Sequence, residues 1–261
     1  MYPFISIGRF QLSLYGLCMA TGILIAGFLA CRRAARRGGE DTMVLALAAA
    51  GVGLGLLGAY VTYFIVSYPG GVPALFQEMR AGDFHGLGEG GLVFYGGLVP
   101  AAAGVLLMAR LLHLDLGLYL DAMVPCVPLG HAFGRLGCTF AGCCYGIDYA
   151  GVGALHTAYA PEHAHFPVQP LEAALNVLLF LALARFTKNR RRGMKTLWAY
   201  LAGYGVIRFG LEFLRGDLIR GVYGAFSTSQ WISLALVALA AGAMICSAMR
   251  KTASNKEGAG R

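Results

Sequence analysis

The 261-residue chain is 57% hydrophobic and only 13% charged, and its apolar residues occur in runs of about twenty, the length that crosses the hydrocarbon core of a bilayer. This composition excludes an ordinary water-soluble protein. The net charge of +8 does not indicate a nucleic-acid-binding protein either, because most Lys and Arg residues directly follow apolar runs, where basic residues set membrane topology.

The first apolar run extends from about Leu12 to about Cys31, where the basic stretch CRRAARR begins. This run is longer than the hydrophobic region of a signal peptide, and no small-residue cleavage site follows it. We therefore expect a retained span with the amino terminus outside.

An all-α, polytopic membrane protein is predicted, with seven spans, an outside amino terminus and a cytoplasmic carboxyl terminus. Basic residues test this topology, because they concentrate in cytoplasmic connections. The predicted inner segments hold fifteen of the 21 Lys and Arg residues, and the outer segments hold four. We expect a single membrane-embedded domain over residues 1–261. Its spans are residues 12–31, 43–66, 92–111, 117–137, 168–187, 196–214 and 229–249, followed by a cytoplasmic tail at 250–261.

Two outer segments are rich in Gly, Pro and aromatic residues: SYPGGVPALFQEMRAGDFHGLGEGG and YGIDYAGVGALHTAYAPEHAHFPVQP. Such composition is typical of loops and amphipathic arms at the membrane surface. The histidines of the second segment, His156, His163 and His165, match no metal-site spacing, and we interpret them as part of a solvated loop.

Charged residues at membrane depth are costly, so they usually face the protein interior and have a partner. Arg135, Arg208 and Glu212 are placed there. Arg208 and Glu212 are four residues apart and share a helix face with Tyr204. One interpretation is an Arg–Glu pair that closes on itself. The other is a polar cavity in which Arg135 and Arg208, from two helices, hold a lipid phosphate through the planar guanidinium fork.

Glycines accompany these charges. Gly51-x-x-x-Gly55 and Gly130-x-x-x-Gly134 predict close helix packing, and GGLVFYGGL (residues 90–98) opens the third span. The glycines that follow Arg135 are expected to break the helix beside it and to expose backbone amides toward a phosphate. They are Gly137, Gly142 and Gly146.

In this order, the motifs resemble prolipoprotein diacylglyceryl transferase, a family of bacterial inner-membrane enzymes that move diacylglycerol from phosphatidylglycerol to the lipobox cysteine of a prolipoprotein. The resemblance extends from Tyr15 to Gln230. It is carried by LYGL, GGLVFYGGL, DAMVPCVPLGHAFGRLG, PVQPLE, YGVIRFGLEFLR and STSQW. It implies seven spans, an outside amino terminus and a site that faces the outer leaflet.

The resemblance also implies roles for single residues. Arg135 and Arg208 would bind and activate the lipid phosphate, while Tyr15, Tyr204 and Glu212 would line or order the site. No cofactor or metal is expected. The other motif positions expected to contact substrate are Gly96, Gly97, His131, Gly134, Gly137, Cys138, Gly142, Cys143, Gly146, Gln169 and Glu172.

Three positions depart from the family pattern. Cys138 stands where the family usually has Asn, Cys143 where it has Glu, and Tyr95 where a histidine is often proposed as general base. By position Tyr95 is a candidate base, although a tyrosine pKa of about 10 suits that task poorly unless it is lowered. His131 and Glu212 are the other candidates. A histidine bonded only within the bundle is the alternative for His131.

The cysteines Cys138, Cys143 and Cys144 allow several interpretations. Small packing residues are favoured. A disulfide between Cys138 and one of the other two, a metal site, or a reactive thiol beside Arg135 are the alternatives. Three thiols without an evident fourth ligand are weak evidence for a metal.

The expected activity is diacylglyceryl transfer to a lipobox thiol, forming a thioether and releasing glycerol phosphate, at the cytoplasmic (inner) membrane. The expected partners are phosphatidylglycerol, the signal peptide of a prolipoprotein and membrane lipid, without nucleic acid. The alternatives are a paralogue with another acceptor, and a lipid-binding or thiol-redox membrane protein without turnover. A secondary transporter is disfavoured, because the sequence shows no repeated halves.

Overall fold

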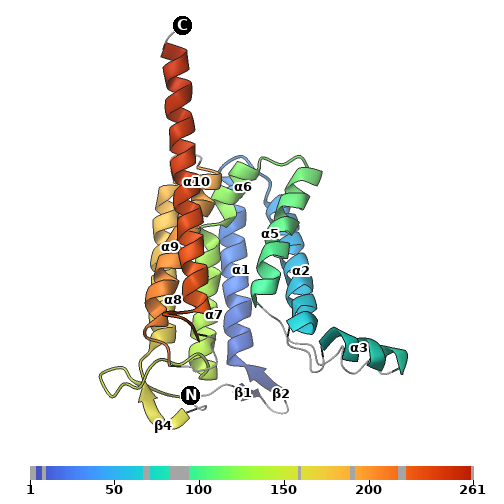
Figure 1. Cartoon of the computed structure of the whole chain (residues 1–261), viewed down its shortest axis with the longest axis vertical. Helices are drawn as coiled ribbons and strands as arrows, with labels where there is room; N and C mark the ends of the chain where they lie inside the picture. The colour runs from blue at the N-terminus through green and yellow to red at the C-terminus, as the bar shows by residue number, and fades with distance from the viewer. Residues whose placement is uncertain are drawn as a thin grey trace. The chain divides into compact units, whose positions relative to one another are not determined.

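The computed structural model describes residues 4–7, 10–66, 71–82, 94–157, 160–188, 192–216 and 222–259. The described chain is mainly helical (Figure 1). It divides into two compact units, one of residues 1–37 and 117–261 and the other of residues 38–116. The single domain expected over residues 1–261 stays a prediction.

The first unit is a helix bundle. Within it α7 packs against α1 and α8, and α9 packs against α8 and α10, so that segments far apart in the chain lie side by side. The bundle consists of α1 (Leu14–Ala35), α6 (Leu116–Met123), α7 (Cys126–Ala141), α8 (Val168–Phe186), α9 (Met194–Glu212) and α10 (Thr228–Ala259).

The second unit holds α2 (Asp41–Val66), α3 (Gly71–Arg80) and α5 (Phe94–Leu111). A Cβ at Gly51 would lie 2.9 Å from Val105 Cγ2 on α5, and one at Gly55 would lie 3.1 Å from Ala101 Cβ. The packing role predicted for these two glycines is therefore confirmed. The short helix α3 is amphipathic and lies in the first outer segment, in agreement with the arm expected there.

A helix lies at each of the seven positions predicted as spans, which confirms the polytopic all-α fold. Five helical stretches of the described chain are long and apolar enough to cross a membrane. The count of seven spans and the orientation of the termini stay predictions. The five are Leu14–Ala35, Asp41–Val66, Leu116–Ala141, Val168–Phe186 and Thr228–Met249.

The predicted fourth span, 117–137, differs in detail. A turn at Val124 and Pro125 separates α6 from α7, because proline has no N–H group to donate to the helical hydrogen bonds.

The helix break expected beside Arg135 was wrong in position. Instead α7 continues to Ala141 and ends at Gly142, whose φ of 74° makes it a left-handed C-cap.

The described chain contains three antiparallel hairpins, the first before α1 and the other two between helices: β1 (Phe4–Ile7) with β2 (Phe10–Ser13), β3 (Leu155–Thr157) with β4 (Ala160–His165), and β5 (Val222–Tyr223) with β6 (Phe226–Ser227). The second outer segment, expected to be loop, thus contains the β3–β4 hairpin. Isolated bridges from Asp148 to His165 and from Gly146 to Arg215 tie the chain after α7 to this hairpin and to the end of α9.

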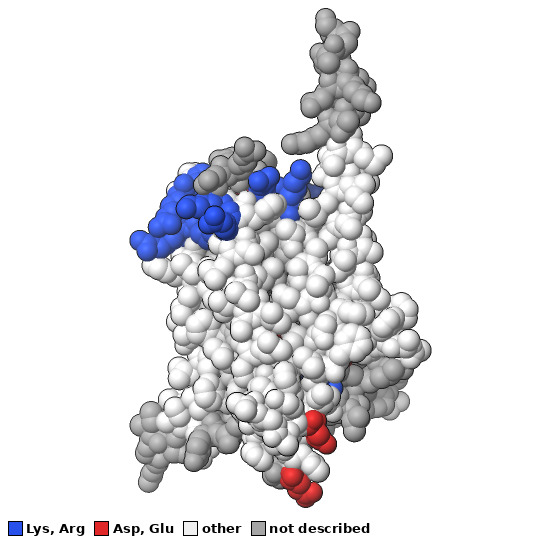
Figure 2. Space-filling view, turned by 90° about the vertical axis from the view of Figure 1, so that its left-hand side faces the viewer, with Lys and Arg blue, Asp and Glu red and all other residues white. Residues whose placement is uncertain are grey.

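Basic side chains gather at one end of the first unit, where α1 and α8 end and α9 begins (Figure 2). The hairpins β1–β2 and β3–β4 lie at its other end (Figure 1). This separation agrees with a cytoplasmic basic end. The described basic residues there are Arg32, Arg33, Arg36, Arg37, Arg185, Lys188, Arg192 and Lys195.

Candidate active site

Arg135 on α7 lies beside an acidic residue of α8. Its Nε is 3.0 Å from Glu172 Oε1. The Glu172 side chain is only 2% exposed, and His131 Nε2 approaches the same oxygen to 3.9 Å. His131 is one helical turn before Arg135, so both face α8. A partly buried guanidinium and a buried carboxylate therefore compensate each other across the α7–α8 contact.

Arg208 on α9 forms the second buried pair. Its Nη2 lies 2.7 Å from Glu212 Oε2, one turn along the same helix, and donates a hydrogen bond of 3.2 Å to Ser229 Oγ at the start of α10. The Arg–Glu contact, which the spacing allowed as one of two interpretations, therefore forms, and phosphate binding by Arg208 stays a prediction. Nη1 of Arg208 is buried and has no hydrogen-bond partner among the described residues.

One polar cluster contains both arginines. The His131 ring packs on Tyr204 of α9 with centroids 5.2 Å apart, and His131 experiences the charges of both Arg135 and Arg208. Tyr204 in turn stacks on Tyr200 at 6.0 Å. On the helix face predicted for Tyr204, Arg208 and Glu212, Tyr204 contacts α7 through His131, and Arg208 contacts the start of α10 through Ser229.

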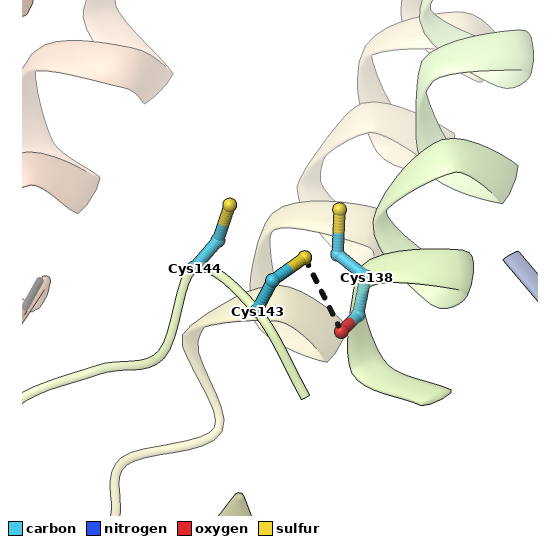
Figure 3. Close-up of side chains that lie close together, drawn as sticks. All are labelled: Cys138, Cys143 and Cys144. Atoms are coloured by element: carbon cyan, nitrogen blue, oxygen red, sulfur yellow. Dashed lines mark hydrogen bonds between the residues drawn. The ribbon is translucent and has the colours of Figure 1, made fainter. Parts of the chain in front are cut away.

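The three cysteines converge next to this cluster. Cys138 is near the end of α7, and Cys143 and Cys144 lie in the turn that follows it (Figure 3). Their sulfurs all lie within 4.8 Å of one another. The Cys143 thiol approaches the Cys138 carbonyl oxygen at 4.0 Å, and all three cysteines are free thiols.

The turn also has unusual backbone and electrostatic features. Cys144 has a φ of 58°, a left-handed conformation that costs free energy in a residue other than glycine. Hydrogen bonds from Cys138 and Cys143, and then the Arg215 side chain, lower the pKa of the Cys144 thiol. The turn is anchored to α8, because Gln169 Nε2 donates a hydrogen bond of 2.9 Å to the Cys143 carbonyl.

Comparison with known proteins identifies the family. The family model described as prolipoprotein diacylglyceryl transferase matches residues 3–246. A phosphatidylglycerol–prolipoprotein diacylglyceryl transferase of Clostridium tetani is 33% identical over 226 residues, covering 84% of this chain and 87% of the relative. One from Dehalococcoides mccartyi is 29% identical over 252 residues, covering 90% and 89%. The chain belongs to the prolipoprotein diacylglyceryl transferase family.

In this family member, most predicted site residues lie in the first unit. Tyr15, in the first turn of α1, packs closely against Gly137 of α7. A Cβ added at Gly137 would lie 3.0 Å from Tyr15 Cδ2. At Gly134 an added Cβ would lie 3.0 Å from Met19 Sδ. At Gly146 it would collide with the Phe166 carbonyl oxygen. Backbone contact therefore excludes a side chain at Gly146, and the packing at Gly134 and Gly137 is tight; contact of these glycines with substrate stays a prediction.

The glycine-rich signature of the family lies in the other unit. Gly96 and Gly97 belong to α5, and a Cβ at either would collide with α2, at Thr62 or at the Gly55 carbonyl. Tyr95 lies in the first turn of α5, and its side chain lies outside the described part of the structure. Their proposed roles in catalysis and substrate binding are not tested by the geometry.

Two polar residues that bond members of the cluster were missed by sequence reasoning. Ser229 binds Arg208, and its place in STSQW was the only signal for it. Asn176 is fully buried one turn after Glu172 and donates a hydrogen bond of 2.8 Å to the Glu172 carbonyl. Its Oδ1 is buried without a hydrogen-bond partner among the described residues. The spacing of Glu172 and Asn176 by four residues was a usable signal.

Proposed function

We propose that the protein transfers the diacylglyceryl group of phosphatidylglycerol to the lipobox cysteine thiol of a prolipoprotein, forming a thioether and releasing glycerol phosphate. The names of its relatives specify a phosphatidylglycerol donor and a prolipoprotein acceptor. The observation that carries the proposal is the buried Nη1 of Arg208, which lacks a hydrogen-bond partner in the described structure. Such a donor requires an explanation, and a phosphate oxygen supplies one.

The two arginines would neutralise the leaving group. Because Glu172 approaches Arg135 through Nε, at least one terminal amino group of Arg135 remains for a phosphate oxygen. Arg208 contributes Nη1 from α9. When the C–O bond to phosphate breaks, negative charge develops on the departing glycerol phosphate, and two fixed guanidinium groups stabilise it more than they stabilise the intact lipid. Glu172 and Glu212 hold the guanidinium planes in place.

The site would serve the outer leaflet of the bacterial cytoplasmic membrane. Arg135 lies in the half of α7 that leads to the cysteine turn and the β3–β4 hairpin, away from the basic end of the first unit. If the basic end is cytoplasmic, as its charge favours, lipid and the signal peptide reach the arginines from the outer side.

The test uses purified protein with phosphatidylglycerol and a lipobox peptide, followed by peptide mass and released glycerol phosphate. Arg135→Lys and Arg208→Lys keep the charge but lose the planar fork, so we expect each to lower kcat/KM by about 100-fold or more. Arg32→Lys, an exposed arginine at the basic end of α1, is the matched control. A wild-type protein that leaves the peptide unmodified under these conditions refutes the proposal.

A further inference from the structure

The thiols of Cys138, Cys143 and Cys144 form a donor set that the phosphate chemistry does not use. They come from a helix end and the turn after it, yet their sulfurs lie within 4.8 Å of one another (Figure 3). Four-coordinate zinc with Zn–S bonds of about 2.3 Å places its sulfurs about 3.8 Å apart. Side-chain rotations that move the sulfur atoms by about an ångström or less would therefore bring the three thiols to the separation found around one zinc ion.

The local backbone holds this arrangement. Gly142 and Cys144 both adopt positive φ, 74° and 58°, and the two left-handed residues turn the chain so that Cys143 and Cys144 return to Cys138. Gln169 fixes the turn through the Cys143 carbonyl. A cysteine in the left-handed conformation is unfavourable by itself. The conformation of Cys144 that places a third sulfur beside the other two therefore costs conformational free energy.

The donor set selects the kind of ion. Three thiolates favour a soft or borderline d¹⁰ cation over Mg²⁺ or Ca²⁺. Within the part of the chain that the structure describes, no fourth His, Cys, Asp or Glu ligand joins the group. Three protein ligands with an open fourth position are the arrangement of catalytic rather than structural zinc sites.

The cluster is also adjacent to the proposed phosphate site. Cys138 is one helical turn after Arg135, and Arg135 interacts electrostatically with both Cys138 and Cys144. Tyr15, on α1, is close to all three cysteines and to Arg135. A ligand in the fourth position would therefore lie next to the lipid phosphate.

We propose that Cys138, Cys143 and Cys144 bind one Zn²⁺ and that its open position takes the acceptor cysteine of the prolipoprotein as a thiolate; the acceptor half of this proposal rests on the proposed function. Coordination deprotonates a thiol outright, so the acceptor proton is released on binding and ends on the glycerol phosphate or in solvent. The thiolate sulfur then forms the C–S bond as the C–O bond to phosphate breaks, and the electron pair of that bond leaves with the phosphate. The neutral thioether is a poorer ligand and dissociates.

Co²⁺ substitution tests the site independently of turnover. Reduced, metal-free protein in detergent would be titrated with Co²⁺ under argon, and the sulfur-to-cobalt charge-transfer and tetrahedral d–d bands recorded. We expect one Co²⁺ per chain, with the spectrum lost in Cys138→Ser, Cys143→Ser and Cys144→Ser and kept in Cys246→Ser, an exposed cysteine on α10. Thermal unfolding of each variant shows whether it remains folded.

A lipobox peptide would then be added without phosphatidylglycerol. A change in the cobalt bands with the cysteine peptide, and none with its Cys→Ser counterpart, supports the acceptor position. Absence of Co²⁺ and Zn²⁺ binding by the wild type, binding that survives all three substitutions, or a disulfide within the cluster of the isolated protein overturns the metal site. An unchanged cobalt spectrum with the cysteine peptide overturns the acceptor role.

The two proposals fail separately. Full transferase activity in a protein stripped of metal by a chelator overturns the acceptor role of the zinc and leaves the transferase function intact. A cobalt spectrum that responds to the peptide, in a protein that never consumes phosphatidylglycerol, refutes the transferase function and leaves the metal site intact.

Discussion

At the scale of single residues, Glu172 balances the charges of the site. Its carboxylate is 3.0 Å from Arg135 and 3.9 Å from His131 and is almost completely buried. Removal of one member of a buried ion pair leaves an uncompensated charge, which costs more than the net contribution of the pair itself. The position of the Arg135 fork in the phosphate site therefore depends on α8.

Glu172→Gln tests this dependence, because it keeps the side-chain volume and removes the charge. We expect a loss of about 3 kcal/mol in unfolding free energy and a fall in kcat of about 100-fold. The lipid KM should change much less, because Arg135 is misplaced but still cationic. Thermal unfolding and steady-state transfer assays in detergent measure these effects.

The control is Glu162→Gln, an exposed carboxylate of the β3–β4 hairpin. It should leave the melting temperature and kcat unchanged. If Glu172→Gln behaves like Glu162→Gln, the pair with Arg135 does not hold the site together.

The sequence predicted which residues would form the cluster better than how they would pair. The i,i+4 spacing of Arg208 and Glu212 lies within one helix, so their contact was predictable. The partner of Arg135 lies on another helix, and one sequence carries no signal that joins α7 to α8. Glu172 was therefore expected to contact substrate, and its pairing with Arg135 emerged only from the fold.

At the scale of elements, the contact of α1 with α7 positions the site, because α7 carries Arg135 and α1 carries Tyr15. Small residues allow this approach. A Cβ at Gly22 would lie 2.5 Å from Phe133 Cβ, whereas a Cβ at Gly27, on the same helix, would meet nothing within 4 Å. The two glycines therefore differ in what they contribute.

Gly22→Ala should destabilise the protein by about 1–3 kcal/mol, because the new Cβ would clash with Phe133 Cβ and the two helices would have to separate. Gly27→Ala should be neutral or stabilising by about 0.5–1 kcal/mol, because alanine restricts the unfolded chain and favours the helix. Thermal unfolding of both variants in the same detergent measures the difference. Equal melting temperatures for the two variants would contradict a close α1–α7 contact at Gly22.

The length of the apolar runs made the helices predictable, whereas the polar composition of the β3–β4 hairpin gave no signal for its strands. Hydropathy placed a helix at every predicted span, because a polypeptide in lipid must satisfy its own backbone hydrogen bonds. The β3–β4 hairpin has no such signal, since its six-residue strand APEHAH is neither apolar nor alternating. The end of α7 was misplaced because glycines are tolerated within membrane helices, and of Gly137, Gly142 and Gly146 only Gly142 adopts positive φ.

At the scale of the whole first unit, a buried carboxylate organises the basic end. Asp121, on α6, accepts hydrogen bonds from the backbone N–H groups of Arg192 and Gly193 and from the Thr196 hydroxyl. It therefore caps the amino terminus of α9, which has no side-chain cap of its own. Arg33 donates hydrogen bonds to the Asp121 carbonyl and to Thr187, adding the ends of α1 and α8.

Asp121→Asn should cost about 3 kcal/mol, because an amide group would face backbone donors and the favourable charge at the helix terminus would be lost. Thermal unfolding measures this loss. Hydrogen exchange should show faster exchange at the start of α9, while the Arg208 end remains protected. Asp115→Asn, an exposed aspartate, is the control. Exchange at the start of α9 that matches the control would show that Asp121 does not act as its cap.

The same basic end predicts the orientation of the molecule in the membrane. Eight described Lys and Arg residues lie where α1 and α8 end and α9 begins, and Figure 2 shows Lys and Arg side chains gathered at one end of the molecule. Basic residues next to membrane spans remain on the cytoplasmic side. With seven spans, the carboxyl terminus would share that side and the β3–β4 hairpin would lie outside.

Reporter fusions in a bacterial host measure this directly. Alkaline phosphatase fused after Thr157, in the hairpin, should be active, and the green fluorescent protein fused there should be dark. At the carboxyl terminus the two reporters should behave in the opposite way, because phosphatase needs the oxidising outer compartment to form its disulfides. An active phosphatase at both positions would require an even number of spans between the amino and carboxyl termini if the amino terminus is outside. The reversed pattern at both positions would place the arginine cluster toward the inner leaflet and remove the route by which an exported prolipoprotein reaches it.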